Sequence, residues 1–194
     1  MSLIFAMITF AFVMSISPGP VNVITLTSGA SRGVLKTLPF VSGATVGFTA
    51  LLFVLGIGAS QLIEQYPKFM EILGVCGALF ILYMAYKIAM SDGTLSTVQQ
   101  KQPRFHEGAL LQWLNPKAWI ACISGIAAFT TQGEFSSLLL FCGLYFFICY
   151  VGISFWAIIG AQTRRFLTTK NHLLWFNRVM GGSLGVVGIY LLLS

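Results

Sequence analysis

The sequence predicts an all-α integral membrane protein with six transmembrane helices arranged as an inverted 3+3 repeat, in which spans 1 and 4 are broken. First, 57% of its 194 residues are hydrophobic and 8% are charged, whereas about a quarter of the residues of soluble domains are charged. Second, apolar runs of about 20 residues, enough to cross a bilayer, recur along the chain. Third, a polar, proline-containing interruption lies inside the first run and again inside the fourth.

These runs and their short loops fill residues 1–194, which we interpret as a single transmembrane transporter domain. Its repeat halves cover about residues 1–90 and 107–194, and the longest polar segment, residues 91–106, links them. Because spans and loops use almost the whole length, a separate soluble catalytic domain would not fit.

The first half contains three predicted spans and the loops between them: span 1 at 3–26, a basic loop at 29–36, span 2 at 38–60, a loop at 61–68 and span 3 at 69–88. Span 1 contains Pro18-Gly19-Pro20, and proline interrupts a helix because it removes a backbone donor. In span 2, Gly43 and Gly47 have the GxxxG spacing that lets helix backbones approach closely in lipid.

The second half has the same order of elements: span 4 at 108–129, a loop at 130–135, span 5 at 136–161, a loop at 162–172, an interfacial lead at 173–178 and span 6 at 179–193. Span 4 contains Asn115-Pro116-Lys117, which falls opposite the first interruption at an offset of about a hundred residues. Gly43 falls opposite Gly143 at the same offset. This weak similarity favours two related halves.

Basic residues set the expected orientation. The loops after spans 1, 3 and 5 carry most of them: Arg32, Lys36, Lys87, Lys101, Arg104, Arg164, Arg165 and Lys170, with Arg178 just beyond. The opposite side has Lys68. The positive-inside rule therefore predicts that these loops are cytoplasmic and that both termini lie on the outer, periplasmic side.

Both interruptions have sequences that favour the start of a helix. In Asn115-Pro116, a good N-cap residue precedes a proline, which is preferred at the first helical position, and Ser17-Pro18 has the same form. A helix that begins within the membrane points free N–H groups and a partial positive charge into a cavity. The two starts together predict a pocket that suits a carboxylate.

Lys117 is the one formal charge between Glu107 and Glu134. It lies about ten helical residues from one end, or roughly 15 Å at 1.5 Å per residue, and a buried ammonium at mid-depth costs at least about 2.5 kcal/mol. We expect Lys117 to face the cavity, where it either binds the substrate carboxylate or exchanges a proton. A shorter span 4, beginning near Pro116, would instead leave Lys117 at the membrane interface.

Asn22 follows the first interruption and has two interpretations. Its amide could bind the amino or carboxyl group of a substrate, or it could satisfy backbone groups left open by the prolines. No Asp or Glu is expected at mid-depth, so the sequence offers no carboxylate for a proton relay.

At these residues the chain resembles the LysE/RhtB family of bacterial amino-acid exporters. The resemblance covers essentially the whole chain: 17–20 in span 1, the turn at 28–33, the glycine-rich span 2 and 112–118 in span 4. It implies gradient-driven export of amino acids or related small zwitterions from the cytoplasm across the bacterial inner membrane. Together with the predicted inverted repeat, this leads us to expect a secondary transporter that exports neutral amino acids by alternating access. Threonine, homoserine, cysteine, leucine and lysine exporters share these motifs, so the substrate stays open.

The residues that we expect to bind substrate are those of the two interruptions: Ser17, Pro18, Gly19, Pro20, Asn22, Asn115, Pro116 and Lys117. The chain places Val21 directly after the second proline, where family members often have a polar residue. Candidate partners are an amino-acid substrate, the lipid bilayer, a coupling proton and a second copy of the chain. No catalytic residue, metal, cofactor or nucleic acid is expected.

Three other classes of function explain the sequence less well. An exporter of another small solute, such as a divalent cation, would need acidic or histidine ligands at mid-depth. An intramembrane enzyme would need a nucleophile with its base or a metal cluster, yet His106 and His172 fall in predicted loops. A purely structural membrane subunit would leave Lys117 and both interruptions without a role.

Overall fold

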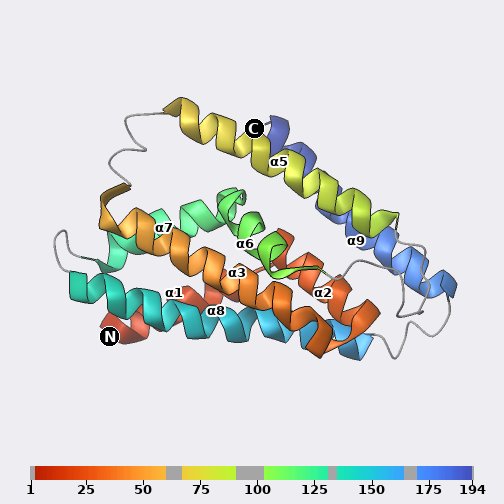
Figure 1. Cartoon of the computed structure of the whole chain (residues 1–194), viewed down its shortest axis with the longest axis horizontal. Coiled ribbons are helices and arrows are strands. Elements are labelled where there is room, and N and C mark those ends of the chain that lie inside the picture. The colour runs from red at the N-terminus through yellow and green to blue at the C-terminus, as the bar shows by residue number, and fades with distance from the viewer. Residues whose placement is uncertain (1–2, 60–66, 91–102, 131–134, 164–169, 194) are drawn as a thin grey trace.

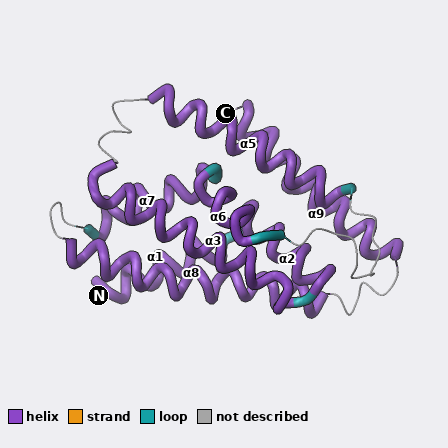
Figure 2. Tube along the Cα trace, viewed as in Figure 1, coloured by secondary structure: helices purple, strands orange, loops and turns teal. Residues whose placement is uncertain are grey.

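The computed structural model describes residues 3–59, 67–90, 103–130, 135–163 and 170–193, and all the regular structure in these ranges is helical (Figures 1 and 2). In chain order the elements are α1 (Leu3–Ile16), α2 (Pro20–Arg32), α3 (Val34–Val54), η1 (Leu55–Ala59), α5 (Pro67–Ala89), α6 (Phe105–Trp113), α7 (Pro116–Phe129), α8 (Phe135–Thr163) and α9 (Lys170–Leu193). The predicted all-helical fold is confirmed.

Several helices are suited to cross a membrane. Within the described ranges, Val34–Gly58 and Phe135–Thr163 have the required length and hydropathy, and the pair α1 and α2 adds a third span if it is counted as one bent segment. At 23 and 24 residues, α5 and α9 also exceed the length of about 20 residues that spans a bilayer.

Both predicted interruptions are real. Between α1 and α2 the chain bends by 61° at residues 17–19. Between α6 and α7 the helix stops for Leu114 and Asn115. Each break coincides with the prolines that cannot continue a helical hydrogen-bond ladder. The breaks therefore lie where the sequence placed them, one in each half of the chain.

Helices from the two halves pack on one another. α3 packs on α6, α2 on α8, and α5 runs alongside α9 at one edge of the molecule (Figure 1). Gly43 and Gly47 of α3 lie directly against the backbone at Phe105 and Ala109 of α6, so any side chain there would overlap it. The predicted GxxxG motif is thus a contact surface between helices.

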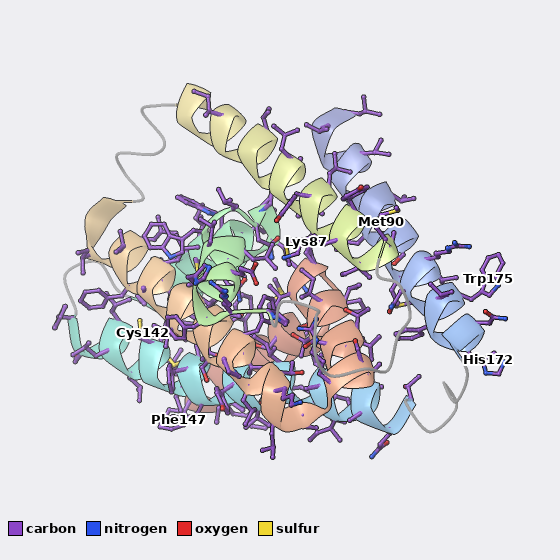
Figure 3. All side chains as sticks on the ribbon, turned by 45° about the vertical axis from the view of Figure 1, so that its right-hand side comes forward. Lys87, Met90, Cys142, Phe147, His172 and Trp175 are labelled. Carbon is purple, nitrogen blue, oxygen red and sulfur yellow. The ribbon has the colours of Figure 1, made fainter. Side chains whose placement is uncertain are left out.

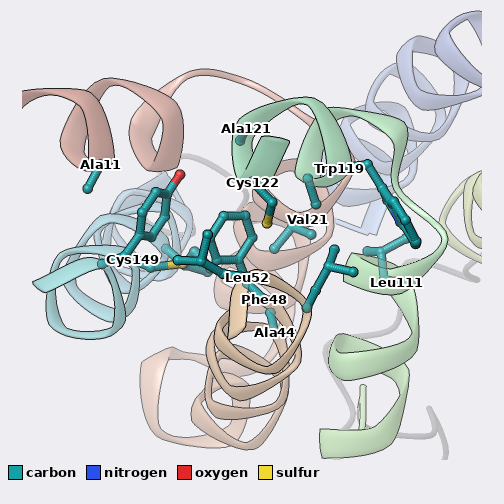
Figure 4. Close-up of a cluster of buried hydrophobic side chains, with 14 of the residues drawn as sticks. Ala11, Val21, Ala44, Phe48, Leu52, Leu111, Trp119, Ala121, Cys122 and Cys149 are labelled. Atoms are coloured by element: carbon teal, nitrogen blue, oxygen red, sulfur yellow. The ribbon is translucent and has the colours of Figure 1, made fainter. Parts of the chain in front are cut away.

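An aromatic and thiol core fills the space between α1, α3, α7 and α8 (Figure 4). Phe48 and Tyr145 stack with ring centroids 4.3 Å apart, and both side chains are buried. Cys122 and Cys149 are buried within the same cluster and carry free thiols. This core holds the two halves together directly beside the breaks.

The structure corrects several predicted loops. The basic loop at 29–36 is helical except at Gly33, because a single glycine with φ of 83° turns the chain between α2 and α3. Helix α6 begins at Phe105 and so takes the end of the linker predicted at 91–106, while residues 91–102 lie outside the described ranges. The interfacial lead at 173–178 is part of the continuous helix α9.

Residues of the two halves that are separated by the offset of about a hundred do not occupy equivalent packing positions. A side chain at Gly143 would meet open space, whereas Gly43 is in close contact with α6. On α8, close contact occurs at Gly152 and Gly160, which face Ser15 and Leu26. Gly43 and Gly143 therefore do not occupy equivalent packing positions.

Candidate functional site

The two breaks meet through Lys117. Its Nζ donates hydrogen bonds to the Ser17 carbonyl oxygen and to Ser17 Oγ, each at 2.7 Å, and to the Pro18 carbonyl oxygen at 3.3 Å. The side chain is half-buried. Because the carbonyl end of a helix carries partial negative charge, the ammonium acts as a cap on the end of α1.

Other side chains satisfy the remaining carbonyls at this end of α1. Asn22 Nδ2 donates to the carbonyl oxygens of Ser15 and Ser17, at 3.0 and 2.8 Å. Trp156 Nε1 donates to the Ile16 carbonyl oxygen at 3.1 Å. An unpaired carbonyl would be costly in a bilayer. Of the two interpretations of Asn22, the structure shows the backbone-satisfying one.

The second helix of the broken span begins at Pro20, with Gly19 as its N-cap residue. The prediction that Ser17-Pro18 starts this helix is wrong, because the Ser17 hydroxyl donates to the Met14 carbonyl oxygen and accepts from Lys117. Gly19 has no side chain with which to cap the helix. Within the described residues, the backbone N–H groups of Val21 and Asn22 have no acceptor.

The start of α7 follows the predicted form. Asn115 is the N-cap residue, its Oδ1 accepts the Lys117 backbone N–H at 3.2 Å, and Pro116 occupies the first helical turn. Trp119 Nε1 donates across the break to the Trp113 carbonyl oxygen at 2.7 Å. Since Asn115 caps this helix, the start of α2 is the one of the two that leaves donors open.

A cavity that is open to solvent lies where the breaks meet, and its volume is about 390 Å³ with the solvent-open space included. Among the predicted site residues, four line it: Gly19, Asn22, Asn115 and Lys117. The other four shape the breaks without lining the cavity: Ser17, Pro18, Pro20 and Pro116. Gly19 lies so close to Lys117 that an added Cβ would be 3.3 Å from the Lys117 Cδ and Nζ atoms.

Three polar lining residues were not among the predicted site residues. Gln112 is buried and lies just before the second break, so its place in the polar stretch 112–119 was a usable signal. Ser15 and Tyr145 also line the cavity. Ser15 Oγ is buried near Tyr145 yet makes no hydrogen bond of standard geometry to a described residue. Tyr145 comes from α8, and nothing in its own apolar run distinguishes it.

A family model described as "LysE type translocator" matches residues 12–194. The chain belongs to the LysE family. Among the related proteins is a cysteine/O-acetylserine efflux protein of Klebsiella pneumoniae, 30% identical over 66% of this chain and 65% of that protein. Proteins of the same name from Salmonella typhi and Escherichia coli K12 are 26% and 27% identical, over 81% and 84% of this chain and 82% and 85% of those proteins. No solved structure matches.

Membership of the LysE family makes the chain a membrane translocator, so the prediction of a transporter rather than an enzyme is confirmed. The apolar helices long enough to span a bilayer fit a multi-pass membrane protein.

Proposed function

We propose that this LysE-family protein exports small neutral amino acids from the cytoplasm and that the cavity between the two breaks holds the substrate. The relatives named for cysteine and O-acetylserine efflux support a neutral amino acid of this size. Cysteine and O-acetylserine both carry an ammonium and a carboxylate group on one carbon, together with a short side chain. The chemistry of the site can be matched to each of these groups.

The observation that carries the proposal is the set of partners around Lys117. Its ammonium is held by three uncharged oxygens, those of the Ser17 backbone and side chain and of the Pro18 backbone. A carboxylate is a stronger partner for an ammonium than a neutral oxygen is. Val21 and Asn22, whose backbone N–H groups lack an acceptor among the described residues, line the same cavity, and free N–H groups at a helix start favour an anion. A substrate carboxylate would bind between them and Lys117.

The rest of the lining selects a small, uncharged side chain. Phe48 and Ala121 supply an apolar wall, and Gln112 and Tyr145 supply polar atoms. No acidic side chain of the described residues lines this cavity. An amino acid with a second cationic group would therefore find no carboxylate partner, and this disfavours lysine and divalent cations.

We propose six spans in an inverted repeat, with α1 and α2 corresponding to α6 and α7, α3 to α8, and α5 to α9. In a pseudo-twofold arrangement, each contact between two helices should have a counterpart between the two corresponding helices. The packing of α3 on α6 has such a counterpart in the packing of α8 on α1 and α2. The correspondence is incomplete, because α2 packs closely on α8 while its counterpart α7 touches α3 at few positions. This difference is expected for alternating access, because the two halves exchange such contacts during transport.

The proposed orientation places both termini on the outer side of the inner membrane. Arg32, Lys87 and Arg104 lie near one another at one end of the bundle, around Glu107. Segments that are distant in sequence thus bring positive charges to one side, which the positive-inside rule assigns to the cytoplasm. Export would draw on a membrane gradient, with Lys117 able to act as the coupling group by exchanging its proton.

The test is counterflow into proteoliposomes that contain the purified protein. Vesicles preloaded with O-acetyl-L-serine are diluted into radiolabelled O-acetyl-L-serine, L-cysteine, L-leucine or L-lysine. We expect accumulation of the first two and little accumulation of L-lysine. The methyl ester of serine, which lacks a carboxylate, is the matched negative substrate. Absence of counterflow with every amino acid tested would refute the proposed function.

A further inference from the structure

Two polar side chains of the cavity at the breaks have no part in binding the substrate carboxylate. Gln112 and Ser15 both line this cavity, and the two residues are 5% and 7% exposed. Gln112 comes from α6 and Ser15 from α1, so each half of the chain contributes one of them. A buried polar group within a membrane is costly unless it has a hydrogen-bond partner. The partners of these two groups therefore have to be identified.

The Gln112 amide has one acceptor oxygen and two N–H donors. Among the described residues, its side chain has no hydrogen-bond partner. Its neighbours at the second break use their polar groups to complete the helix ends, since Asn115 caps α7 and Trp119 donates to the Trp113 carbonyl oxygen. Gln112 thus presents unused hydrogen-bonding atoms in the wall of the cavity.

The Ser15 hydroxyl differs from other hydroxyls on the helices of this protein. Thr25, Thr27 and Thr49 each donate to the carbonyl oxygen four residues earlier, a common hydrogen bond for a hydroxyl on a helix. Ser15 Oγ is buried near Tyr145 and makes no hydrogen bond of standard geometry to a described residue. An oxygen that its own helix does not use can accept a hydrogen bond from a ligand.

Helix α8 holds Ser15 in the wall of the cavity. A Cβ added at Gly152 would lie 3.0 Å from the Ser15 Cβ atom, so α1 and α8 are in close contact here. Tyr145 and Cys149 of α8 line the same cavity. Phe147, between them in sequence, is 71% exposed and lies on the outer side of α8 (Figure 3). One face of α8 therefore forms the cavity wall next to Ser15.

Ser15 and Gln112 occupy the same place relative to the two breaks. Ser15 comes directly before Ile16, the last residue of α1, and Gln112 directly before Trp113, the last residue of α6. The carbonyl end of a helix carries partial negative charge and favours a cation, whereas the start of a helix favours an anion. The cavity at the breaks thus combines two helix ends of the first kind with the starts of α2 and α7.

We propose that Gln112 and Ser15 bind the ammonium group of the exported amino acid, in the same cavity in which Lys117 binds its carboxylate. The inference rests on the proposed function. Gln112 Oε1 and Ser15 Oγ would accept hydrogen bonds from the ammonium, and the carbonyl ends of α1 and α6 add electrostatic attraction. A site built to bind an amino group rejects an analogue that lacks it, because its buried acceptors are then left unpaired.

The test compares O-acetyl-L-serine with 3-acetoxypropanoate, which has the same carboxylate and acetyl ester but no amino group. The dissociation constant of each ligand is obtained from the rise of the unfolding midpoint of the purified protein with ligand concentration. We expect the wild-type protein to bind O-acetyl-L-serine at least about tenfold more tightly. Gln112→Leu or Ser15→Ala should weaken O-acetyl-L-serine binding at least about threefold and leave 3-acetoxypropanoate binding unchanged.

Matched variants outside the cavity separate binding from a general effect on the protein. Gln162→Leu changes an exposed glutamine of α8. Ser154→Ala removes a buried hydroxyl that also lacks a partner among the described residues and does not line the cavity. Both variants should keep the wild-type constants. Lys117→Met should weaken the two ligands alike, because both have a carboxylate.

Several outcomes would overturn the inference in protein that still performs counterflow. These are equal wild-type affinity for the two ligands, equal weakening of both ligands by Gln112→Leu and Ser15→Ala, an unchanged affinity for O-acetyl-L-serine in both variants, or no rise of the midpoint with either ligand. Each would leave the proposed function intact. Absence of counterflow with every amino acid would refute both.

Discussion

The Lys117 ammonium lies 2.7 Å from the carbonyl oxygen of Ser17, a residue 100 positions earlier in the chain. This contact joins the break in the first broken helix to the break in the second. It places a cation inside a bundle whose nearest acceptors are neutral. A site of this kind can exchange a backbone acceptor for a substrate carboxylate, because the ammonium is already present and partly desolvated.

A substitution at Gly19 tests whether transport depends on the position of the Lys117 ammonium. Replacing Gly19 with Ala would place a methyl group 3.3 Å from the Lys117 Cδ and Nζ atoms and push the ammonium away from the break. We expect counterflow to fall by about tenfold, equivalent to about 1.4 kcal/mol, with little loss of folded protein. Gly143→Ala is the control, since a methyl group there meets nothing within 4 Å. Equal transport by the two variants would refute the close fit around Lys117.

A substitution at Asn22 tests how much its hydrogen bonds to the backbone carbonyls at the first break stabilise the protein. Asn22→Leu keeps the volume but removes the donor to the carbonyl oxygens of Ser15 and Ser17. Because Ser17 retains Lys117 as a partner, the main loss is an unpaired carbonyl at Ser15, at about 1–3 kcal/mol. Thermal unfolding in detergent should show a lower midpoint. Thr9→Val, at an exposed hydroxyl bonded to Phe5, should change it little, and an unchanged midpoint for Asn22→Leu would contradict this role.

Gly43 tests the packing between the two halves. A methyl group at Gly43 would overlap the backbone of Phe105, so α3 and α6 would have to separate. Overpacking of this kind costs about 1–3 kcal/mol. We predict a lower unfolding midpoint and weaker counterflow for Gly43→Ala. Gly143→Ala serves again as the matched change, and equal stability of both proteins would show that the close approach is dispensable.

Variants of the ion pair between Lys87 and Glu107 test how α5 and α9 are held to the bundle. Because both side chains are partly exposed, we expect Glu107→Gln to cost about 0.5–1 kcal/mol. The exchange of both residues, Lys87→Glu with Glu107→Lys, should recover part of that loss. Unfolding midpoints of the single and double variants measure the coupling. A double variant less stable than the sum of the single changes would contradict the pair.

The sequence predicted the breaks well because their causes are local. Proline at positions 18, 20 and 116 prevents a continuous ladder whatever the surroundings, and Asn115 caps the helix that follows it. The start of α2 was misplaced because Ser17 uses its hydroxyl for Lys117, a partner 100 residues away. Long-range contacts of this kind cannot be deduced from a local pattern.

The cavity was predicted only in part for the same reason. Lys117 and Asn115 were recognised because a charge and a cap stand out in an apolar run. Tyr145 was not, since its place in the lining depends on how α8 packs across the breaks. The one-residue turn at Gly33 was also missed, because basic residues suggested a loop where the structure continues the helix to Arg32.

The most direct test of the account is counterflow of O-acetyl-L-serine by Lys117→Met proteoliposomes, compared with Lys36→Met vesicles that contain the same amount of folded protein. Methionine keeps the length and apolar character of the stem and removes the ammonium that holds the Ser17 and Pro18 oxygens. The account predicts that Lys117→Met abolishes counterflow while Lys36→Met retains it. Wild-type counterflow by Lys117→Met would contradict the central claim that this ammonium holds the substrate carboxylate between the two breaks.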